Sequence, residues 1–509
     1  MADALKTPTL VPTIPSSAPS SIRKVDIDAL ADLEKQDDYS SLDEKSHEED
    51  FEVKFSKNDP EDPYNWPSWK KWAVTALSGA LVLNATLASS LPAGNMPLMR
   101  QSLHFSQEVG SLTLSLFVLG FAFGPILWGP LSEQYGRRMV YIISFALYLG
   151  TQIGCALSPN TAAILVFRLL GGMFAAAPLT NSGGMISDMF DAASRGKPVA
   201  AFTVTPFAGP SLAPLISGYM AVSGVSWRWP ESLKPVLLVK KAIRLRRETG
   251  DDRWWAPYEK QRVPFAVRMQ GILTKPFRML VTEPMLMAMT LYMSFMYGVM
   301  YLFFNAYPIV FAQGHHMSAG TAGLMFLPIC IGGILGGLSY IFIFGSLYAR
   351  EATKHAPNPV PPEFRLVQCI YAAPMFPIAI FWFGWTSFPH ISFWAPMMAG
   401  LLVGFSVVWI FLGMFAYIID TYLVAAASAL AAAVIVRSLF GAAFPLFATQ
   451  MYQNLGAHWA STILGCIALI LTPIPYVLIK FGPKLREMSK ASQAGTAAFK
   501  AAMAQAKSG

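Results

Sequence analysis

Two arginines lie inside strongly apolar segments, where an ionised side chain needs a partner or a task. Arg168 lies in "ILVFRLLGGMF" and Arg437 in "AAVIVRSLFG". A charge within a membrane-spanning helix is costly, so it normally faces a cavity, a partner or a substrate. Both arginines are therefore candidates for transport or coupling. Arg168 has the alternative of snorkelling to the outer interface, whereas Arg437 is expected to face a wet cavity, a carboxylate or a polar substrate group.

Two aspartates lie at the ends of apolar segments. Asp188 ends the apolar run that holds Arg168, and Asp420 ends the run before the one that holds Arg437. Asp188 is placed to pair with a basic loop at Arg137, while Asp420 either serves as a partner or caps its loop. No Asp or Glu lies at the middle of an apolar run. The sequence therefore does not reveal a proton carrier.

A short charged loop, "GPLSEQYGRR", joins two apolar segments. Its glycines allow helix ends to approach closely, and its arginines can pair with acids or with helix C-termini. The loop is thus predicted to be a tight, charged hinge. Its candidate residues are Gly129, Glu133, Gly136, Arg137 and Arg138.

The segment "FTVTPFAGPSLAPLISGYM" combines prolines with small residues, which predicts a kinked helix with a close packing face. The residues concerned are Gly209, Pro210, Pro214 and Gly218.

Polar residues in other apolar segments are candidates for lining a substrate cavity, because amides and amphipathic aromatics suit planar, partly apolar ligands. Each has the alternative of packing or hydrogen bonding between helices. These residues are Asn84, Asn181, Tyr301 and Asn305.

The composition places these residues in a membrane. Of the 509 residues, 54% are hydrophobic and only 13% are charged, and apolar runs of about 20 residues recur, each long enough to cross a bilayer as a helix. We expect an all-α polytopic membrane protein. The four cysteines have no metal-site spacing, and neither a phosphate-binding loop nor a hydrolase signature is present. We therefore expect no metal, no cofactor, no enzymatic activity and no nucleic-acid partner.

The apolar runs predict eleven spans, five in an N-terminal bundle at 71–229 and six in a C-terminal bundle at 284–481. An acidic tail at 1–70 is expected to be disordered and cytosolic, and a second tail follows at 482–509. The spans are expected at about 72–92, 110–129, 139–157, 162–187, 199–221, 285–311, 319–347, 366–388, 393–418, 423–452 and 459–480.

The charge distribution does not fit an odd number of spans. With a cytosolic N-terminus, eleven spans would leave the basic, amphipathic linker at 230–283 outside, together with the basic C-terminal tail. From Glu231 to Arg278 there are 12 Lys and Arg against 5 Asp and Glu, and such segments normally stay in the cytosol. One further span of about 20 residues between Trp229 and Pro230 would restore the rule.

These motifs resemble those of the major facilitator superfamily. The loop at Gly129 resembles its loop signature, with Glu133 where Asp is frequent. Arg168 matches an arginine implicated in proton transfer. The Gly209-Pro210 segment resembles the motif of its antiporters, although Ala213 and Ser217 replace glycines.

Longer segments narrow the resemblance. "NDPEDPYNWPSWKKW", "PLTNSGG", "YIIDTYLVAAASALAA" and "RSLFGAAFPLFATQMYQNLGAHWASTILG" are similar to those of the fungal twelve-span drug:proton antiporters. The resemblance implies a fold of two helical bundles with twelve spans, of which the sixth would lie between "WRW" and "PE".

The resemblance further implies proton-coupled efflux of drugs, polyamines or a self-produced toxin. The expected partners are a small-molecule substrate, protons and the lipid bilayer, and the chain is expected to be a monomer in the plasma membrane, with the vacuolar membrane as the alternative. Because one span is missing at Trp229, two other readings stay open. The chain could be a non-transporting, receptor-like remnant, or its gene model could omit an exon.

Overall fold

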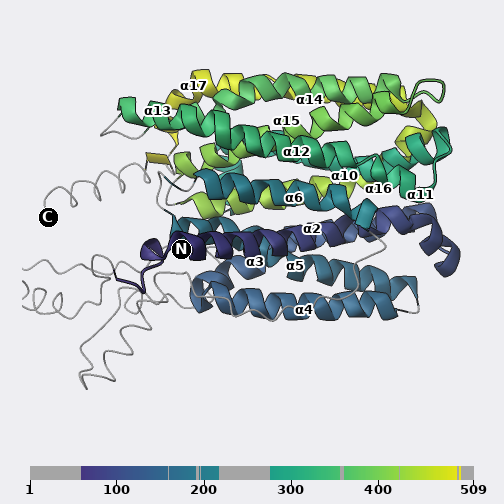
Figure 1. The fold of residues 1–509 in the computed structure, drawn as a ribbon, viewed down its shortest axis with the longest axis horizontal. Helices are drawn as coiled ribbons and strands as arrows, with labels where there is room; N and C mark the ends of the chain where they lie inside the picture. Colours follow the sequence, from purple (N-terminus) through teal and green to yellow (C-terminus); the bar gives the residue numbers. More distant parts are fainter. Residues whose placement is uncertain are drawn as a thin grey trace, which may run out of the picture. The chain divides into compact units, whose positions relative to one another are not determined.

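The computed structural model describes most of the chain after the acidic tail, and every regular element in that part is helical (Figure 1). The described residues all belong to one of the two compact units into which the chain divides. They are residues 59–158, 160–190, 194, 196–216, 276–355, 360–422, 425–489 and 492–493.

The helices of the first half begin and end at residues that suit their positions. The Ser106 and Asn160 side chains accept hydrogen bonds from the backbone at the starts of the second and fourth helices, as N-capping residues do. Gly136, with φ of 88°, separates the second helix from the third. After the short turn η1 (Pro63–Asn65), the helices are α2 (Ser68–Leu103), α3 (Gln107–Tyr135), α4 (Arg137–Leu157), α5 (Thr161–Met189) and α6 (Gly196–Ile216).

The second half contains longer helices with local irregularities. Two of them include π-helical turns, and α16 breaks at Gly456, where φ is 76° and ψ is 158°. Its elements are α10 (Pro284–Tyr307), η2 (Pro308–Gly314), α11 (Ala319–Leu324), α12 (Leu327–Ser339), η3 (Tyr340–Phe344), α13 (Gly345–His355), η4 (Pro362–Leu366), α14 (Val367–Thr386), α15 (Trp394–Tyr422), α16 (Ala426–Leu471) and α17 (Ile474–Met488).

Nine helical segments in the described residues are long and apolar enough to cross a membrane. One of them, Ser428–Met488, is 61 residues long and includes the break at Gly456, so it contains the last two predicted spans. Helix α6 lies where the fifth span was predicted. The Trp229–Pro230 junction, the linker up to residue 275 and both tails fall largely outside the described residues. The eleven-span total and the proposed missing span therefore stay predictions.

Neighbouring helices approach closely at glycines. A Cβ on Gly120 of α3 would lie 2.5 Å from the Leu169 carbonyl oxygen of α5, and a Cβ on Gly404 of α15 would lie 2.9 Å from the Ile329 carbonyl carbon of α12. Small residues at such positions let membrane helices pack backbone against backbone. Close backbone contacts at glycines thus stabilise the packing within each half.

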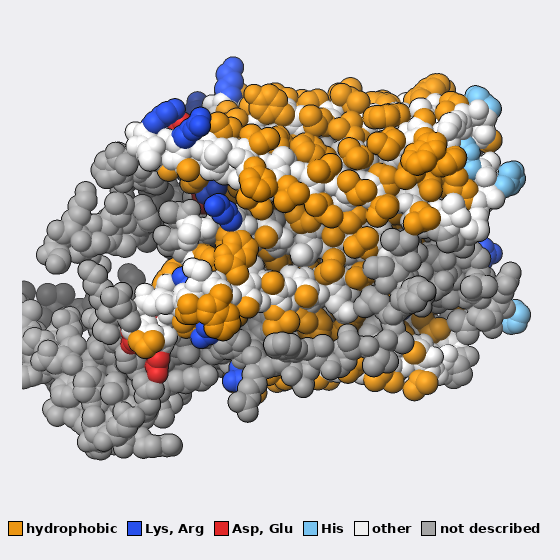
Figure 2. Space-filling view, in the orientation of Figure 1, with side chains coloured by type: hydrophobic (Ala, Val, Ile, Leu, Met, Phe, Trp, Pro, Cys, Tyr) orange, Lys and Arg blue, Asp and Glu red, His pale blue; other side chains and the backbone are white. Residues whose placement is uncertain are grey.

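The two halves meet along α2, α3 and α6 on one side and α10, α12, α15 and α16 on the other (Figure 1). The rings of Phe207 in α6 and Phe411 in α15 lie 4.9 Å apart across this boundary. Figure 2 shows apolar side chains over the middle of the helices and most Lys, Arg, Asp and Glu side chains near one end. We call that end the charged end. This distribution is typical of a protein that spans a bilayer.

Candidate functional site

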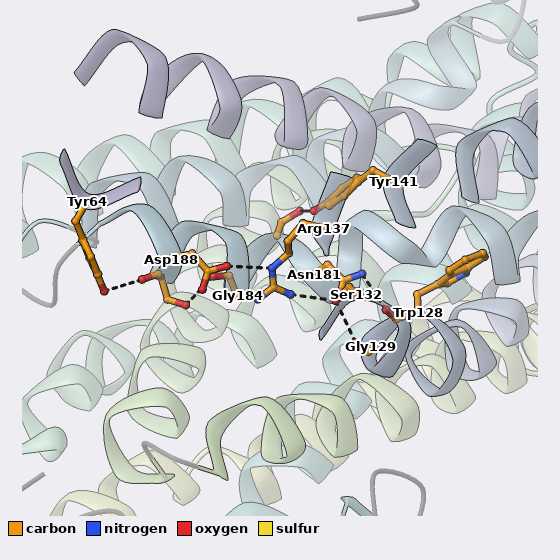
Figure 3. Close-up of polar contacts among 11 residues, drawn as sticks. Tyr64, Trp128, Gly129, Ser132, Arg137, Tyr141, Asn181, Gly184 and Asp188 are labelled. Atoms are coloured by element: carbon orange, nitrogen blue, oxygen red, sulfur yellow. Dashed lines mark hydrogen bonds and ion pairs between the residues drawn. The ribbon is translucent and has the colours of Figure 1, made fainter. Parts of the chain in front are cut away.

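The first ion-pair network lies at the charged end of the first half, and Figure 3 shows its contacts. Arg137, at the start of α4, is only 7% exposed. Its Nε donates to Oδ2 of Asp188 at 3.1 Å, and its Nη1 donates to the Ser132 hydroxyl at 3.1 Å. A Cβ on Gly184 would lie 2.5 Å from Nη2 of Arg137, so glycine makes room for the guanidinium. The network ties α3, α4 and α5 together.

The same network holds Asn181, which the sequence offered as a cavity residue. Its Oδ1 accepts from Ser132 at 2.8 Å and its Nδ2 donates to the Trp128 carbonyl at 3.3 Å (Figure 3). The carbonyl of Gly129 accepts from the same serine at 3.1 Å. Both polar ends of Asn181 are thus engaged between α3 and α5, which supports its alternative role in hydrogen bonding between helices. Glu133 and Arg138 are exposed.

A second ion-pair network lies at the charged end of the second half. Nε of Arg365, in η4, donates to Oδ2 of Asp420 at 2.8 Å, and its guanidinium lies over the Tyr348 ring at 3.7 Å. Arg486 of α17 makes two hydrogen bonds to the Glu363 carboxylate, at 2.8 and 3.0 Å. The partner of Asp420 is therefore Arg365, and no contact joins Asp420 to Arg437 in the described part of the chain.

Sequence reasoning missed Glu363, Arg365 and Arg486 as members of a network. The signal available was "PEFRL", which places two opposite charges directly before an apolar run. Charged residues directly before a membrane span are equally well explained as signals that set the orientation of the span in the membrane. Only the fold shows that they pair with residues 55 and 123 positions away.

Arg168 is buried and donates hydrogen bonds to three backbone carbonyls. It is 5% exposed. Its Nε donates to the Thr113 carbonyl of α3 at 2.8 Å, and its two Nη atoms donate to the Ala88 and Ser89 carbonyls of α2 at 2.7 Å each. The Phe117 ring lies 4.2 Å from its guanidinium carbon. Arg168 therefore points into the bundle and does not snorkel to the interface, which rules out that alternative in this conformation.

Arg437 is equally buried but has a different environment. It is 6% exposed and lies among aromatic rings. Its guanidinium carbon is 4.6 Å from the Tyr297 ring and 5.7 Å from the rings of both Phe411 and Phe415. Its Nε has no hydrogen-bond partner, and in the described residues no carboxylate lies within ion-pair distance.

Polar side chains form a line where the halves meet. The hydroxyls of Ser89 and Tyr301 lie 2.8 Å apart, and the Tyr297 hydroxyl lies 3.4 Å from that of Tyr301. Nδ2 of Asn305 donates to the Pro445 carbonyl at 2.8 Å and contacts the Ser111 hydroxyl at 3.3 Å. Tyr301 and Asn305 thus hydrogen-bond between the halves, and Asn84 is half-buried in α2.

The glycine–proline segment lies in α6 and packs on α2. A Cβ on Gly209 would lie 2.9 Å from the Leu83 carbonyl oxygen and closer still to the Thr86 hydroxyl. The Pro210 carbonyl accepts from the Ser90 hydroxyl at 3.1 Å. Pro214 continues the helix, and Gly218 lies outside the described residues. Within the described residues, no group of three or more His, Cys, Asp or Glu side chains could hold a metal ion.

Known proteins with similar sequences are membrane transporters. The family model described as Major Facilitator Superfamily matches residues 79–445. The chain is 36% identical over 471 residues to "Major facilitator superfamily multidrug transporter mdrA" of Aspergillus fumigatus, covering 88% of this chain and 77% of that protein. It is 38% identical over 460 residues to "Citrinin biosynthesis cluster MFS transporter mrr1" of Monascus ruber, with 86% and 91% covered. It is 36% identical over 474 residues to "Polyamine transporter 3" of Saccharomyces cerevisiae, with 89% and 76% covered.

The fold resembles that of a solved sugar transporter. The proton:xylose symporter XylE, bound to 6-bromo-6-deoxy-D-glucose, superposes with a TM-score of 0.56 at 15% identity, covering 82% of this chain and 96% of that one. A partially occluded inward-open structure of XylE from E. coli gives a TM-score of 0.53 at 18% identity, covering 81% and 98%. At such identities the likeness concerns the fold alone.

Proposed function

The chain belongs to the major facilitator superfamily, and from this premise we propose that it exports small organic molecules in exchange for protons. It is a multi-pass membrane protein of all-α fold, as the sequence predicted. The names of its relatives, which include multidrug, efflux and polyamine transporters, support export. The observation that carries the proposal is the line of buried polar side chains between two otherwise apolar helical halves, where transporters of this kind bind substrate.

The two ion-pair networks suit alternating access. Both lie at the charged end, one in each half, and each joins the ends of helices within its own half. Rocking of one half against the other requires each half to move as a rigid body. We propose that Arg137–Asp188 and Arg365–Asp420 keep the helix ends of each half together during this movement.

Arg168 is our candidate for coupling to protons. It joins α5 to the backbones of α2 and α3, and Ser89, one of its acceptors, contacts Tyr301 of the other half. A change of protonation or hydrogen bonding near Arg168 would therefore reach the boundary between the halves directly. We place the protein in the plasma membrane as a monomer, with the vacuolar membrane as the alternative location.

The test is transport by the purified full chain in proteoliposomes. With a pH gradient imposed, we expect at least one compound from a panel of aromatic substrates to be transported against its own concentration gradient. A protonophore, which removes the pH gradient, should abolish this transport. Panel movement unchanged by the protonophore would contradict proton coupling. Lack of movement of every panel member, together with a transcript that reads straight through the Trp229–Pro230 codons, would favour the non-transporting alternative.

A further inference from the structure

Arg437 is a buried cation for which the described protein supplies no counter-charge. We propose that it recognises the anionic group of a planar organic substrate, together with Tyr297, Ser115 and Ser294. This inference rests on the export function proposed above and names the class of molecule exported. Its basis is the unpartnered Nε of Arg437 in α16, together with unpartnered hydroxyls on α3 and α10, the helices that pack against α16.

The charge on Arg437 is unbalanced in this conformation. A buried cation without a partner costs several kcal/mol, so such groups are normally paired. Four of the five acids described in the second half have other partners: Glu283 contacts Tyr422, Glu351 pairs with Lys354, Glu363 pairs with Arg486 and Asp420 pairs with Arg365. The fifth, Glu487, is exposed near the end of α17. A counter-charge for Arg437 must therefore come from outside these residues.

The comparison with Arg168 shows that burial alone does not explain why Arg437 lacks a hydrogen-bond acceptor. Arg168 lies at the same depth of burial, and three carbonyls accept its hydrogen bonds at 2.7 to 2.8 Å. Arg437 has ring faces on several sides but leaves Nε without an acceptor. Ring faces stabilise a cation without occupying its N–H donors, so those donors remain available to a ligand.

Two further buried hydroxyls without partners lie on α3 and α10, the helices that pack against α16. The Ser115 and Ser294 hydroxyls are buried without hydrogen-bond partners. Ser294 lies three residues before Tyr297 on α10, and Ser115 lies three residues before Val118 on α3, so each shares a helix face with that neighbour. A Cβ on Gly441, four residues after Arg437, would lie 2.9 Å from the Tyr297 ring and 3.0 Å from Val118. The three helix faces therefore converge.

This set of groups fits a planar anion better than a cation. A guanidinium matches a carboxylate with two parallel hydrogen bonds, aromatic rings favour a planar body, and hydroxyls can donate to further oxygens. A polyamine would bring a second positive charge against Arg437, and like charges in a medium of low dielectric constant repel. Tyr297 and Tyr301 are 2% and 1% exposed, so the ligand enters only when the halves separate.

The test uses three probes that share one ring system and differ in charge: 1-naphthoate, 1-naphthamide and 1-naphthylmethylammonium. We expect isothermal titration of the full chain in detergent to show that the anion binds at least about tenfold more tightly than either other probe. Arg437→Gln should remove this preference while leaving 1-naphthamide binding in place. Equal binding of the three probes, a preference for the cation, or no 1-naphthoate binding at about 1 mM would overturn the inference.

Two variants guard against an effect on folding. Ser438→Ala removes the neighbouring hydroxyl, which is also buried without a partner, and should leave all three dissociation constants unchanged. Arg437→Lys keeps the charge but not the two-pronged geometry, so it should lower the anion preference by about threefold. If Arg437→Gln does not fold, the test rests on Arg437→Lys. An anion preference in Arg437→Lys equal to that of the wild type would overturn the inference.

The inference and the proposed export function fail in different ways. Proton-driven transport of the cationic probe without 1-naphthoate binding would keep export and overturn the anion site. Conversely, 1-naphthoate binding that depends on Arg437, without proton-driven transport of any probe, would support the site and contradict the proposed function.

Discussion

The two halves of the molecule each enclose one arginine in the membrane-spanning region, and they treat it in opposite ways. In the first half, Arg168 donates to three backbone carbonyls. In the second half, Arg437 lies against three aromatic rings with an unpartnered Nε. Fully satisfied buried polar groups fix a structure, whereas partly satisfied ones leave energy for a ligand to recover. We infer that Arg168 holds the helices of its half together, which is the property through which we propose that it couples to protons, and that Arg437 serves recognition.

At the charged end the halves are alike. In each half an arginine near the start of a helix pairs with an aspartate at the end of another helix. Arg137, the first residue of α4, pairs with Asp188, and Arg365, in the turn η4 before α14, pairs with Asp420. The second half adds Arg486 and Glu363. Both halves thus close their helix ends with charge while differing at mid-membrane, and the four predictions below test this comparison.

Replacing Arg168 by methionine should have the largest effect on stability. The Thr113, Ala88 and Ser89 carbonyls would lose charged donors, and we expect the free energy of unfolding to fall by about 3 kcal/mol. Denaturation of the purified protein in mixed micelles measures this. Arg168→Lys should recover only part of the loss, because one ammonium cannot reach all three carbonyls with the same geometry. If Arg168→Met unfolds at the same midpoint denaturant concentration as the wild type, Arg168 does not stabilise its half, and the contrast with Arg437 disappears.

Close helix contacts should matter equally in both halves. Gly209→Ala would press a methyl group into Thr86 and Leu83 of α2, and Gly332→Ala would press one into the Leu401 backbone of α15. We expect each to cost about 2 kcal/mol of stability. Gly150→Ala is the matched control, since a Cβ there meets nothing within 4 Å. Because alanine is the better helix former, the control should be neutral or slightly stabilising. A loss in the control as large as in the other two would contradict the packing explanation.

The two ion pairs should show similar, smaller coupling energies. A double-mutant cycle with Arg137→Gln and Asp188→Asn, and a second with Arg365→Gln and Asp420→Asn, should each give about 1 kcal/mol. Thermal unfolding in detergent at low and high salt provides the values. Arg138→Gln, at an exposed position, serves as the control. Coupling confined to one half would show that the charged ends are not equivalent.

Replacing Arg437 by methionine should have the smallest effect on stability. Nε of Arg437 donates no hydrogen bond that could be lost. An apolar side chain would replace a desolvated charge, so the free energy of unfolding should change by less than about 1 kcal/mol or rise. The same denaturation assay applies, with Arg168→Met measured beside it. A loss as large as that of Arg168→Met would mean that Arg437 is also a structural tie.

Much of the architecture could be predicted from the apolar pattern. The span expected at 162–187 is α5, Thr161–Met189, and the one expected at 393–418 is α15, Trp394–Tyr422. The gap expected between residues 452 and 459 contains the break at Gly456. Such predictions succeed because length and hydropathy alone decide whether a segment can cross a bilayer. The π-helical turns at Pro308–Gly314 and Tyr340–Phe344 were not predicted, since their sequences carry no periodic signal for them.

The site was only partly predictable. Charged and polar residues in apolar runs identified Arg168, Arg437, Tyr301 and Asn305 as candidates, because the cost of burying them is independent of the fold. Their partners were not predictable. The Ser89–Tyr301 contact joins residues 212 positions apart, and Asn181, offered as a cavity residue, is engaged by Ser132 and Trp128.

The sequence by itself determined that this is a polytopic helical membrane protein with two costly arginines in its interior. Composition and span length settle the first point, and the price of a charge in hydrocarbon settles the second. Only the tertiary structure decided which arginine is satisfied. A guanidinium needs acceptors within about 3 Å. Whether carbonyls or aromatic rings surround it depends on how α5 packs on α2 and α3 and how α16 packs on α10 and α15.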